Sequence, residues 1–289
     1  MKRVVISRKG FDSSTGKKPP RASPIFKNGS IFSIPVHIDN ETPHSFKEVS
    51  YAGINAYDAI KHVYSNCRKQ VYSENDACHY DPNLSTKPGL FGQQGSDQRE
   101  LEKGSVSEGD LFLFFGWFKT YEFKDYFKNL DCHHLFGWLQ IGSIVQGTNK
   151  IKIFCEERNI KHPHSYGSWT KNTLYIANNH LESHYGVLRN KGSGLFPETN
   201  EKLVLSEQEN KRKSMWKMPE KYFLEIGESL CAAEMFSVPN SRGPRNWFNS
   251  RQLTIDTHVG NWQEMVLNSE EYPSIEKWAF DLIKEFGTR

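Results

Sequence analysis

The sequence predicts an α+β fold, with a mixed, largely antiparallel, β-rich centre and flanking helices. The strongest indication is the apolar segment Asp110–Phe118, which has strand length and suits burial on both faces. A second segment, His134–Val145, has the composition of a partner strand. The third is the amphipathic pattern at Glu276–Phe286, which is typical of a helix. We therefore expect one domain over residues 1–289, built around a β-hairpin at about 109–145.

Local patterns predict further elements along the chain. Short β-branched or alternating runs predict strands, and apolar residues three or four positions apart predict a helix. On these grounds we expect strands at Val4–Ser7, Ile31–Ile38, Ile151–Cys155 and Thr173–Ala177, and a helix at Tyr57–Val71. Residues 72–107 are polar and show no clear periodicity. They predict a long connection, and such connections in compact domains are usually functional or mobile.

The composition is that of an ordinary globular chain and restricts the function only slightly. The 37 basic and 34 acidic residues leave a formal net charge of +3, which is too small to indicate a duplex-binding protein. The 5 cysteines are odd in number and form no Cys-x-x-Cys pair, which argues against a disulfide scaffold and a zinc ribbon. No apolar stretch approaches the roughly 20 residues that span a bilayer. We expect a soluble, cytoplasmic protein without a membrane partner.

The segment after the first predicted strand has the chemistry of a phosphate-binding loop. Arg8 and Lys9 supply cations, and Asp12 and Ser13 follow a glycine. An arginine fork matches phosphate oxygens, and backbone N–H groups at a following helix start would add to the site. The segment is neither a Walker loop nor a Rossmann fingerprint. The alternative is a surface loop that Asp12 caps.

A second candidate is the pair His79 and Asp81. At this spacing the two side chains share one side of an extended segment, so they can act as a base and its orienting partner or as two metal ligands. No second cluster at ligand spacing completes a metal site, and we predict no metal centre. The alternative is that both residues order a loop through local hydrogen bonds, since Asp before Pro is common in turns.

Two further groups suit recognition of a base. Gln93 and Gln94 lie between glycines, and each amide offers a donor and an acceptor to a base edge. Trp117 and Trp138 follow glycines on the two strands of the predicted hairpin, where an indole face can stack on a base. The alternatives are a flexible linker for the glutamines and core packing for the tryptophans.

Histidines also gather later in the chain, at His162, His164, His180 and His184. A metal site there is one interpretation. We favour the plainer one, in which these histidines have structural roles, because no ligand spacing unites them.

An arginine-rich segment near the C-terminus is the last candidate. Arg245 and Arg251 flank Trp247 and Phe248, and guanidinium groups between aromatic rings are typical of a nucleic-acid contact strip. A basic surface loop that its aromatic residues anchor explains the same pattern equally well.

Three blocks of the sequence carry a resemblance to a known family. They are Val4–Ser14 with Ser23–Ile25, Cys78–Leu84 with Phe91–Gly95, and Gly109–Phe118 with His134–Gly142. Together they resemble the nucleotide modification associated domain family, type 3, which genomic context links to DNA base hypermodification. The two central strands are also similar to those of PUA-like domains, including the EVE and ASCH types, which bind RNA or modified bases on a small barrel. That second likeness implies a PUA-like barrel as an alternative form of the β-rich centre.

The resemblance implies a protein that acts on or with a modified nucleotide or base, and we consider a transferase-like enzyme first. The alternatives are a non-catalytic, PUA-like reader of modified bases or nucleic acid, and an interaction subunit of a modification or phage-defence system. Partners would be a nucleotide or nucleic acid and other modification or defence proteins. The sequence identifies no cofactor. The catalytic residues that we predict are Arg8, Asp12, His79 and Asp81. The nucleotide-binding residues that we predict are Lys9, Ser13, Gln93, Gln94, Trp117, Trp138, Arg245 and Arg251.

Overall fold

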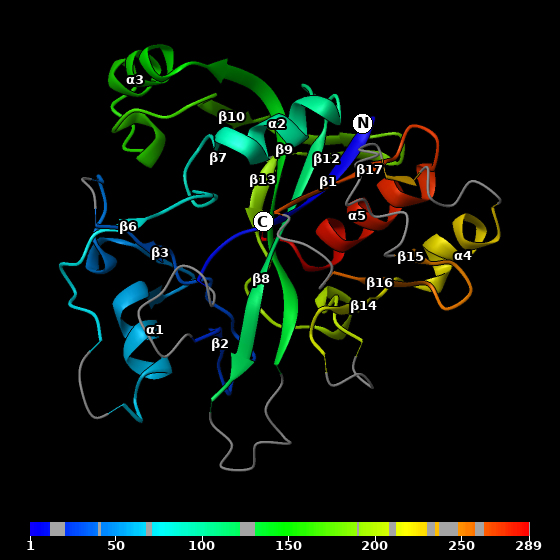
Figure 1. Cartoon of the computed structure of the whole chain (residues 1–289), viewed down its shortest axis with the longest axis horizontal. Coiled ribbons are helices and arrows are strands. Elements are labelled where there is room, and N and C mark those ends of the chain that lie inside the picture. The colour runs from blue at the N-terminus through cyan, green and yellow to red at the C-terminus, as the bar shows by residue number, and fades with distance from the viewer. Residues whose placement is uncertain are drawn as a thin grey trace.

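The fold is α+β, as the sequence predicts, and its centre is a mixed, mostly antiparallel sheet (Figure 1). The computed structural model describes residues 1–11, 21–39, 42–67, 71–121, 131–189, 191–207, 212–229, 235–236, 248–257 and 263–288. The sheet has 8 strands in the order β17-β1-β8-β9-β10-β7, with β13 beside β9 and β2 beside β8. Their bounds are β1 Arg3–Arg8, β2 Ser23–Ile25, β7 Leu90–Gln93, β8 Leu111–Thr120, β9 Asp131–Gln146, β10 Thr173–Ala177, β13 Ser193–Leu195 and β17 Glu264–Asn268.

Helices and short strand pairs surround this sheet. The helices are α1 Ala56–Val63, α2 Gly95–Lys103, α3 Thr148–Glu157, α4 Glu220–Glu228 and α5 Pro273–Phe286, with 3-10 turns η1 Phe46–Glu48, η3 Pro163–Ser165 and η4 Glu201–Leu203. The short strands are β3 Val36–His37 with β6 Cys78–His79, β4 Ser50–Tyr51 with β5 Ile54–Asn55, β11 His180–Ser183 with β12 Gly186–Arg189, and β14 Met215–Lys217 with β15 Phe248–Asn249 and β16 Thr254–Asp256. Among the described residues, no helix is long and apolar enough to cross a membrane.

The predicted hairpin is confirmed. β8 and β9 pair antiparallel from Leu111 opposite Gln140 to Lys119 opposite Asp131, with one irregularity between Phe114 and Phe115. β9 then continues beyond β8 and pairs with β10, so this one strand joins the two halves of the sheet. The sheet stays open, because its edge strands β17 and β7 do not pair with each other. The barrel suggested by the PUA-like resemblance is therefore not formed by the described strands.

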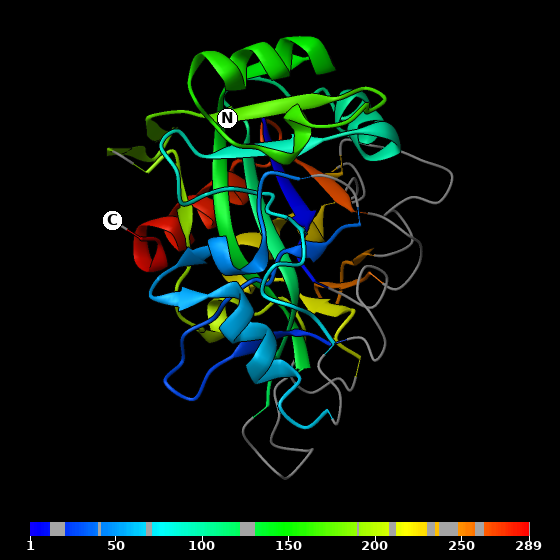
Figure 2. The same ribbon diagram turned by 90° about the vertical axis from the view of Figure 1, so that its left-hand side faces the viewer.

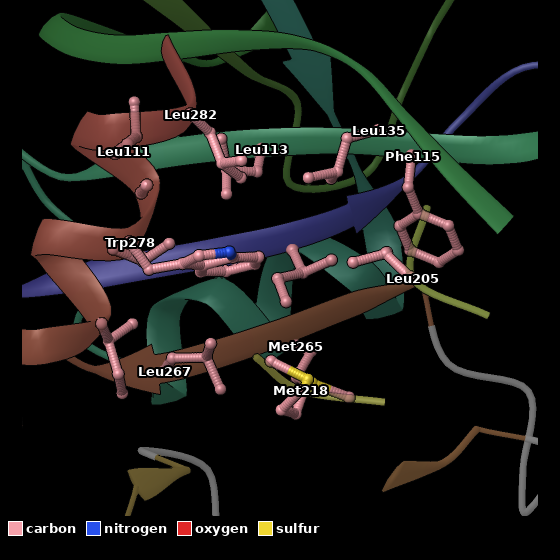
Figure 3. Packing of buried hydrophobic residues seen from close by; sticks show 14 of the residues in the cluster. Leu111, Leu113, Phe115, Leu135, Leu205, Met218, Met265, Leu267, Trp278 and Leu282 are labelled. Carbon is pink, nitrogen blue, oxygen red and sulfur yellow. The ribbon is translucent and has the colours of Figure 1, made fainter. Parts of the chain in front are cut away.

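Both faces of β8 are buried, which explains its continuous apolar run. Leu111 and Leu113 pack on one face against Trp278 of α5 (Figure 3). Phe112 and Phe114 pack on the other face against Phe91 of β7, with ring centroids 4.9 and 5.0 Å apart. The half of the sheet that carries β7 therefore folds back over the hairpin.

Helix α3 lies over β10 and β7 at one end of the molecule (Figure 2). The prediction of a strand at Ile151–Cys155 is wrong, because this segment lies inside α3. Ile151 and Cys155 are buried one helical turn apart, whereas Ile153 is 53% exposed. The apparent alternation of Ile151 and Ile153 is thus incidental to the fold.

Three other expectations need correction. Residues 72–107 are not one long connection, since they contain β6, β7 and α2. Helix α1 ends at Val63, well before Val71. Of the strand expected at Ile31–Ile38, only a bridge between Ile31 and Ile25 and the short strand β3 are formed. These polar segments contain short elements that tertiary pairing stabilises.

Candidate functional site

The Asp81 carboxylate is buried among three imidazoles. Its side chain is 3% exposed, although Asp81 follows a strand of only two residues, β6. Oδ2 lies 3.6 Å from Nε2 of His79 and 3.4 Å from Nε2 of His164, and Oδ1 lies 3.4 Å from Nε2 of His162. We call these four residues the Asp81 cluster. His79 is the most open imidazole, at 24% exposure, whereas those of His162 and His164 are 0% and 3% exposed.

Three segments that are distant in the chain bring the cluster together. β6 carries His79 and is fixed by its pairing with β3. The turn η3 begins with a proline and carries His164, and His162 caps its N-terminal end. Strand β7 supplies the Gly92 N–H, which donates to both oxygens of Asp81 at 3.0 and 3.1 Å. The carboxylate is thus held by backbone as well as by imidazoles.

The protons of two histidines can be assigned from their other contacts. Asn172 accepts at Oδ1 from Nδ1 of His164, at 2.6 Å, while its Nδ2 donates to the His164 carbonyl. Nδ1 of His164 therefore carries the proton, and its Nε2 presents a lone pair to Asp81. In His162 the roles are reversed: Nδ1 accepts from the backbone N–H of His164 at 3.3 Å, so the proton lies on Nε2.

The charges of the cluster follow from burial and from mutual attraction. Burial alone would raise the pKa of Asp81, but His162, His79 and His164 outweigh it and hold that pKa well below its usual range. Burial lowers the pKa of His164 to about 4, although Asp81 opposes this shift. The cluster therefore contains an ionised carboxylate at neutral pH.

A small hollow adjoins Asp81. Its lining includes Gly10, Ser33, Tyr51 and Tyr80, and its volume of about 20 Å³ has room for one water-sized group. Gly10 belongs to the predicted phosphate loop and has a φ of 86°, a conformation that favours glycine. The start of that loop and Asp81 therefore meet at one hollow.

A larger cleft lies next to this hollow and shares two lining residues with it, Leu84 and Leu195. Its volume is about 220 Å³, and its lining includes Lys87, Asn178 and Asn179. An ammonium group and two amides are suited to a phosphate and a base edge. The sequence analysis did not single out any of these residues.

Lys9 and Gln93 come together on a residue that the sequence analysis missed, Glu264 of β17. Oε1 of Glu264 accepts from Lys9 Nζ at 2.8 Å, from Gln93 Nε2 at 2.6 Å and from Ser7 Oγ at 3.0 Å. Burial raises the pKa of Glu264, and Lys9 opposes that shift. The side chains of Lys9 and Glu264 are 10% and 1% exposed, so this cation neutralises a buried carboxylate. This pairing favours a structural role for Lys9 over phosphate binding, which remains a prediction.

Other residues of the predicted loop are separated from Lys9 or lie outside the described residues. Arg8 is the last residue of β1, and strand alternation directs its side chain to the face opposite Ser7 and Lys9. Asp12 and Ser13 fall outside the described residues. Gln94 precedes α2, and its backbone N–H donates to Oε1 of Gln93.

The two tryptophans of the hairpin differ in exposure. Trp138 is 0% exposed, packs on Phe196 with centroids 5.0 Å apart, and donates from Nε1 to the Lys191 carbonyl. This burial favours core packing, one of the two interpretations of Trp138. Trp117 is partly exposed and donates from Nε1 to Asp131. The ammonium of Lys213 lies 4.4 Å from the centroid of the Trp117 ring, so a base would share that ring with a cation.

The remaining candidates lie away from the Asp81 cluster. Arg251 is exposed in the turn between β15 and β16, on the opposite side of the molecule from β6 (Figure 1). Arg245 falls outside the described residues. His184 contacts the buried Glu276 and no second imidazole in the part of the chain described, and His180 begins β11. Of the four later histidines, His162 and His164 therefore belong to the Asp81 cluster, whereas His180 and His184 do not.

Comparison with protein-family models gives a match over most of the chain. The model of a family described as nucleotide modification associated domain 3 matches residues 3–268. No curated protein and no solved structure matches the chain.

Proposed function

Since this chain belongs to the nucleotide modification associated domain 3 family, we propose that it is an enzyme that modifies a nucleotide or a base, with the Asp81 cluster as its reaction centre. The family supports a role related to nucleotide modification. The Asp81 cluster supports a catalytic role rather than a role in binding alone. The reaction that we favour is transfer of a group to a base from an activated second substrate. The bond between the group and its donor breaks, the donor's leaving group keeps the electron pair, and the base loses a proton.

The observation that carries this proposal is the ionised carboxylate of Asp81 among three imidazoles, two of which are almost fully buried. A buried charge is costly for folding, and hydrophobic residues of similar volume often stabilise a core equally well. Strongly shifted pKa values beside a hollow are typical of reaction centres. A purely structural role would not require three imidazoles on one carboxylate.

The neighbouring spaces suggest how a substrate would bind. The hollow beside Asp81 admits one small group, such as a substituent of a base or a water molecule. The larger cleft would hold the rest of a nucleotide, with Asn178 and Asn179 on a base edge and Lys87 on a phosphate. Asp81, which lines the hollow, would meet the reacting group.

An enzyme explains these features better than a reader. A reader that captures a base by stacking needs an exposed aromatic face. Trp138 is fully buried, and the ring of Trp117 is shared with Lys213. The buried charges of the Asp81 cluster are also unnecessary for stacking.

The test compares wild type, Asp81→Asn and Glu100→Gln. Glu100 is a matched control because its carboxylate pairs with Lys103 on the surface of α2. The probes are the four deoxynucleoside monophosphates, the four triphosphates and a DNA duplex, each incubated with a small-molecule cell extract that supplies donors. Mass spectrometry of nucleosides detects products both in vitro and in DNA from expressing cells. We expect Asp81→Asn to remove product formation while nucleotide affinity changes less than threefold.

Two results would contradict the proposal. One is a folded Asp81→Asn protein that forms product at the wild-type rate. The other is a wild-type protein that binds these probes and changes none of them in vitro or in cells, which would favour a reader. A Lys87→Ala variant tests the cleft separately, because it should weaken nucleotide affinity without changing the rate at saturation.

A further inference from the structure

Three potential ligand atoms of the Asp81 cluster converge on one point. One imidazole nitrogen of His79, one of His164 and a carboxylate oxygen of Asp81 all lie within 4.8 Å of one another. None of these imidazoles makes a good hydrogen bond to the carboxylate, since the N–O separations are 3.4 Å and more. The three atoms are therefore close enough together to share one cation.

The proton assignment of His164 supports a cation at this point. Because Nδ1 of His164 donates to Asn172, its Nε2 presents a lone pair to Oδ2 of Asp81. Nε2 of His164 and Oδ2 of Asp81 lie 3.4 Å apart in a buried place, so both atoms can bind one cation. Asn172 is also the kind of outer partner that fixes the ring and tautomer of a metal-binding histidine.

His162 has a different role. Its Nε2 is buried without a hydrogen-bond partner and faces the other oxygen of Asp81, Oδ1, at 3.4 Å. Because this nitrogen carries a proton, it attracts Oδ1. That attraction fixes the rotation of the carboxylate and directs Oδ2 toward His79 and His164. His162 is thus a positioning residue.

We infer that His79, Asp81 and His164 bind one divalent transition-metal ion. This inference deepens the proposed function. The role of the ion in the reaction rests on that function, whereas binding of the ion does not. Imidazole nitrogens with one carboxylate oxygen suit zinc or ferrous iron, whereas magnesium and calcium prefer oxygen ligands. Three protein ligands leave open coordination positions, as catalytic sites require. A water molecule at such a position would be activated next to the hollow.

The experiment measures metal binding directly. The full chain is stripped with a chelator and titrated with Zn²⁺, Co²⁺ and Mg²⁺ by calorimetry, and the visible absorption of bound Co²⁺ reports its ligands. We expect one Zn²⁺ or Co²⁺ per chain and no Mg²⁺ binding. His79→Asn should weaken Zn²⁺ binding at least tenfold, and His184→Asn should leave it unchanged. His184 is the matched control because it contacts a carboxylate, Glu276, outside the cluster.

The controls separate this inference from the proposed function. Circular dichroism checks the fold of each variant, and His164→Gln replaces His79→Asn if the latter does not fold. Two results would overturn the inference. One is a stripped wild-type chain that binds neither Zn²⁺ nor Co²⁺. The other is a folded His79→Asn or His164→Gln protein that binds Zn²⁺ as tightly as wild type does. Turnover by a metal-free chain would leave the proposed function intact. Tight metal binding without turnover would contradict the proposed function alone.

Discussion

A methyl group on Gly92 would lie 2.3 Å from Cδ2 of His164, so the imidazole occupies the space that a side chain at this position would fill. Gly92→Ala should therefore displace His164 from Asp81. We expect a loss of about 1–3 kcal/mol in the free energy of unfolding, as for other overpacked sites. We also expect at least tenfold weaker Zn²⁺ binding, measured by calorimetry on the folded protein.

Gly89 provides the control for this substitution. A methyl group there would meet Ser193, with Oγ at 2.2 Å, away from the Asp81 cluster. Gly89→Ala should therefore destabilise the protein to a similar extent and leave Zn²⁺ affinity unchanged. Equal Zn²⁺ affinity in both variants would show that the packing of His164 against Gly92 does not matter for the ion.

The contact between Asn172 and His164 gives a second prediction. Asn172→Ala removes the acceptor that keeps the proton on Nδ1 of His164. We expect Zn²⁺ affinity to fall by about 10–100-fold, which is typical for loss of an outer partner. Asn172→Asp keeps an acceptor oxygen and should recover most of that affinity. If both variants weaken binding equally, Asn172 acts only through packing or through its bond to the backbone.

These features show how far the sequence predicts the structure. The hairpin is predictable because Leu111–Phe115 is apolar at every position, so burial on both faces is its plain consequence. Residues 90–103 carry no clear local signal, because β7 is only 4 residues long and contains Gly92, and α2 is largely polar. Their stability comes from pairing with β10 and from packing, neither of which has a local signal.

The candidate site is likewise only partly predictable from the sequence. His79 and Asp81 are neighbours in sequence, so their shared chemistry could be predicted. His162 and His164 meet them only because η3 lies against β7, a tertiary contact with no signature in the spacing. The pairing of Lys9 with Glu264 depends likewise on the adjacency of β1 and β17. A buried carboxylate that neutralises a predicted phosphate ligand cannot be inferred from the loop alone.

That pairing gives a third prediction. Lys9→Met leaves the buried Glu264 carboxylate without its cation, so we expect the free energy of unfolding at pH 7 to fall by about 3–5 kcal/mol. Because burial raises the pKa of Glu264, protonation should reduce this loss as the pH falls. Urea denaturation at several pH values measures both effects. The double variant Lys9→Met, Glu264→Gln should recover most of the lost stability. If it does not, Lys9 contributes through packing on Phe91, whose ring centroid is 4.9 Å from Nζ of Lys9.

A buried histidine outside the site gives the last prediction, which concerns pH. Burial lowers the pKa of His134 from 6.5 to about 4, although its contact with the Leu135 carbonyl opposes the shift. Between these two values the unfolded chain binds a proton that the folded chain does not, so stability rises with pH. The contribution of His134 is complete above pH 6.5 and is lost as the pH falls toward 4. A shift of this size corresponds to about 3 kcal/mol.

His134→Gln should remove this dependence, because an amide can still reach Thr199, which lies 3.0 Å from Nε2, but does not titrate. Urea denaturation from pH 7 to pH 4 should give a smaller fall in unfolding free energy for the variant than for wild type, by about 3 kcal/mol. His180→Gln is the control, since this histidine at the start of β11 is partly exposed and its replacement should leave the curve unchanged. Parallel curves for wild type and His134→Gln would mean that the folded protein accepts a proton on His134 at little cost. The acid sensitivity of the fold would then have to arise from other groups.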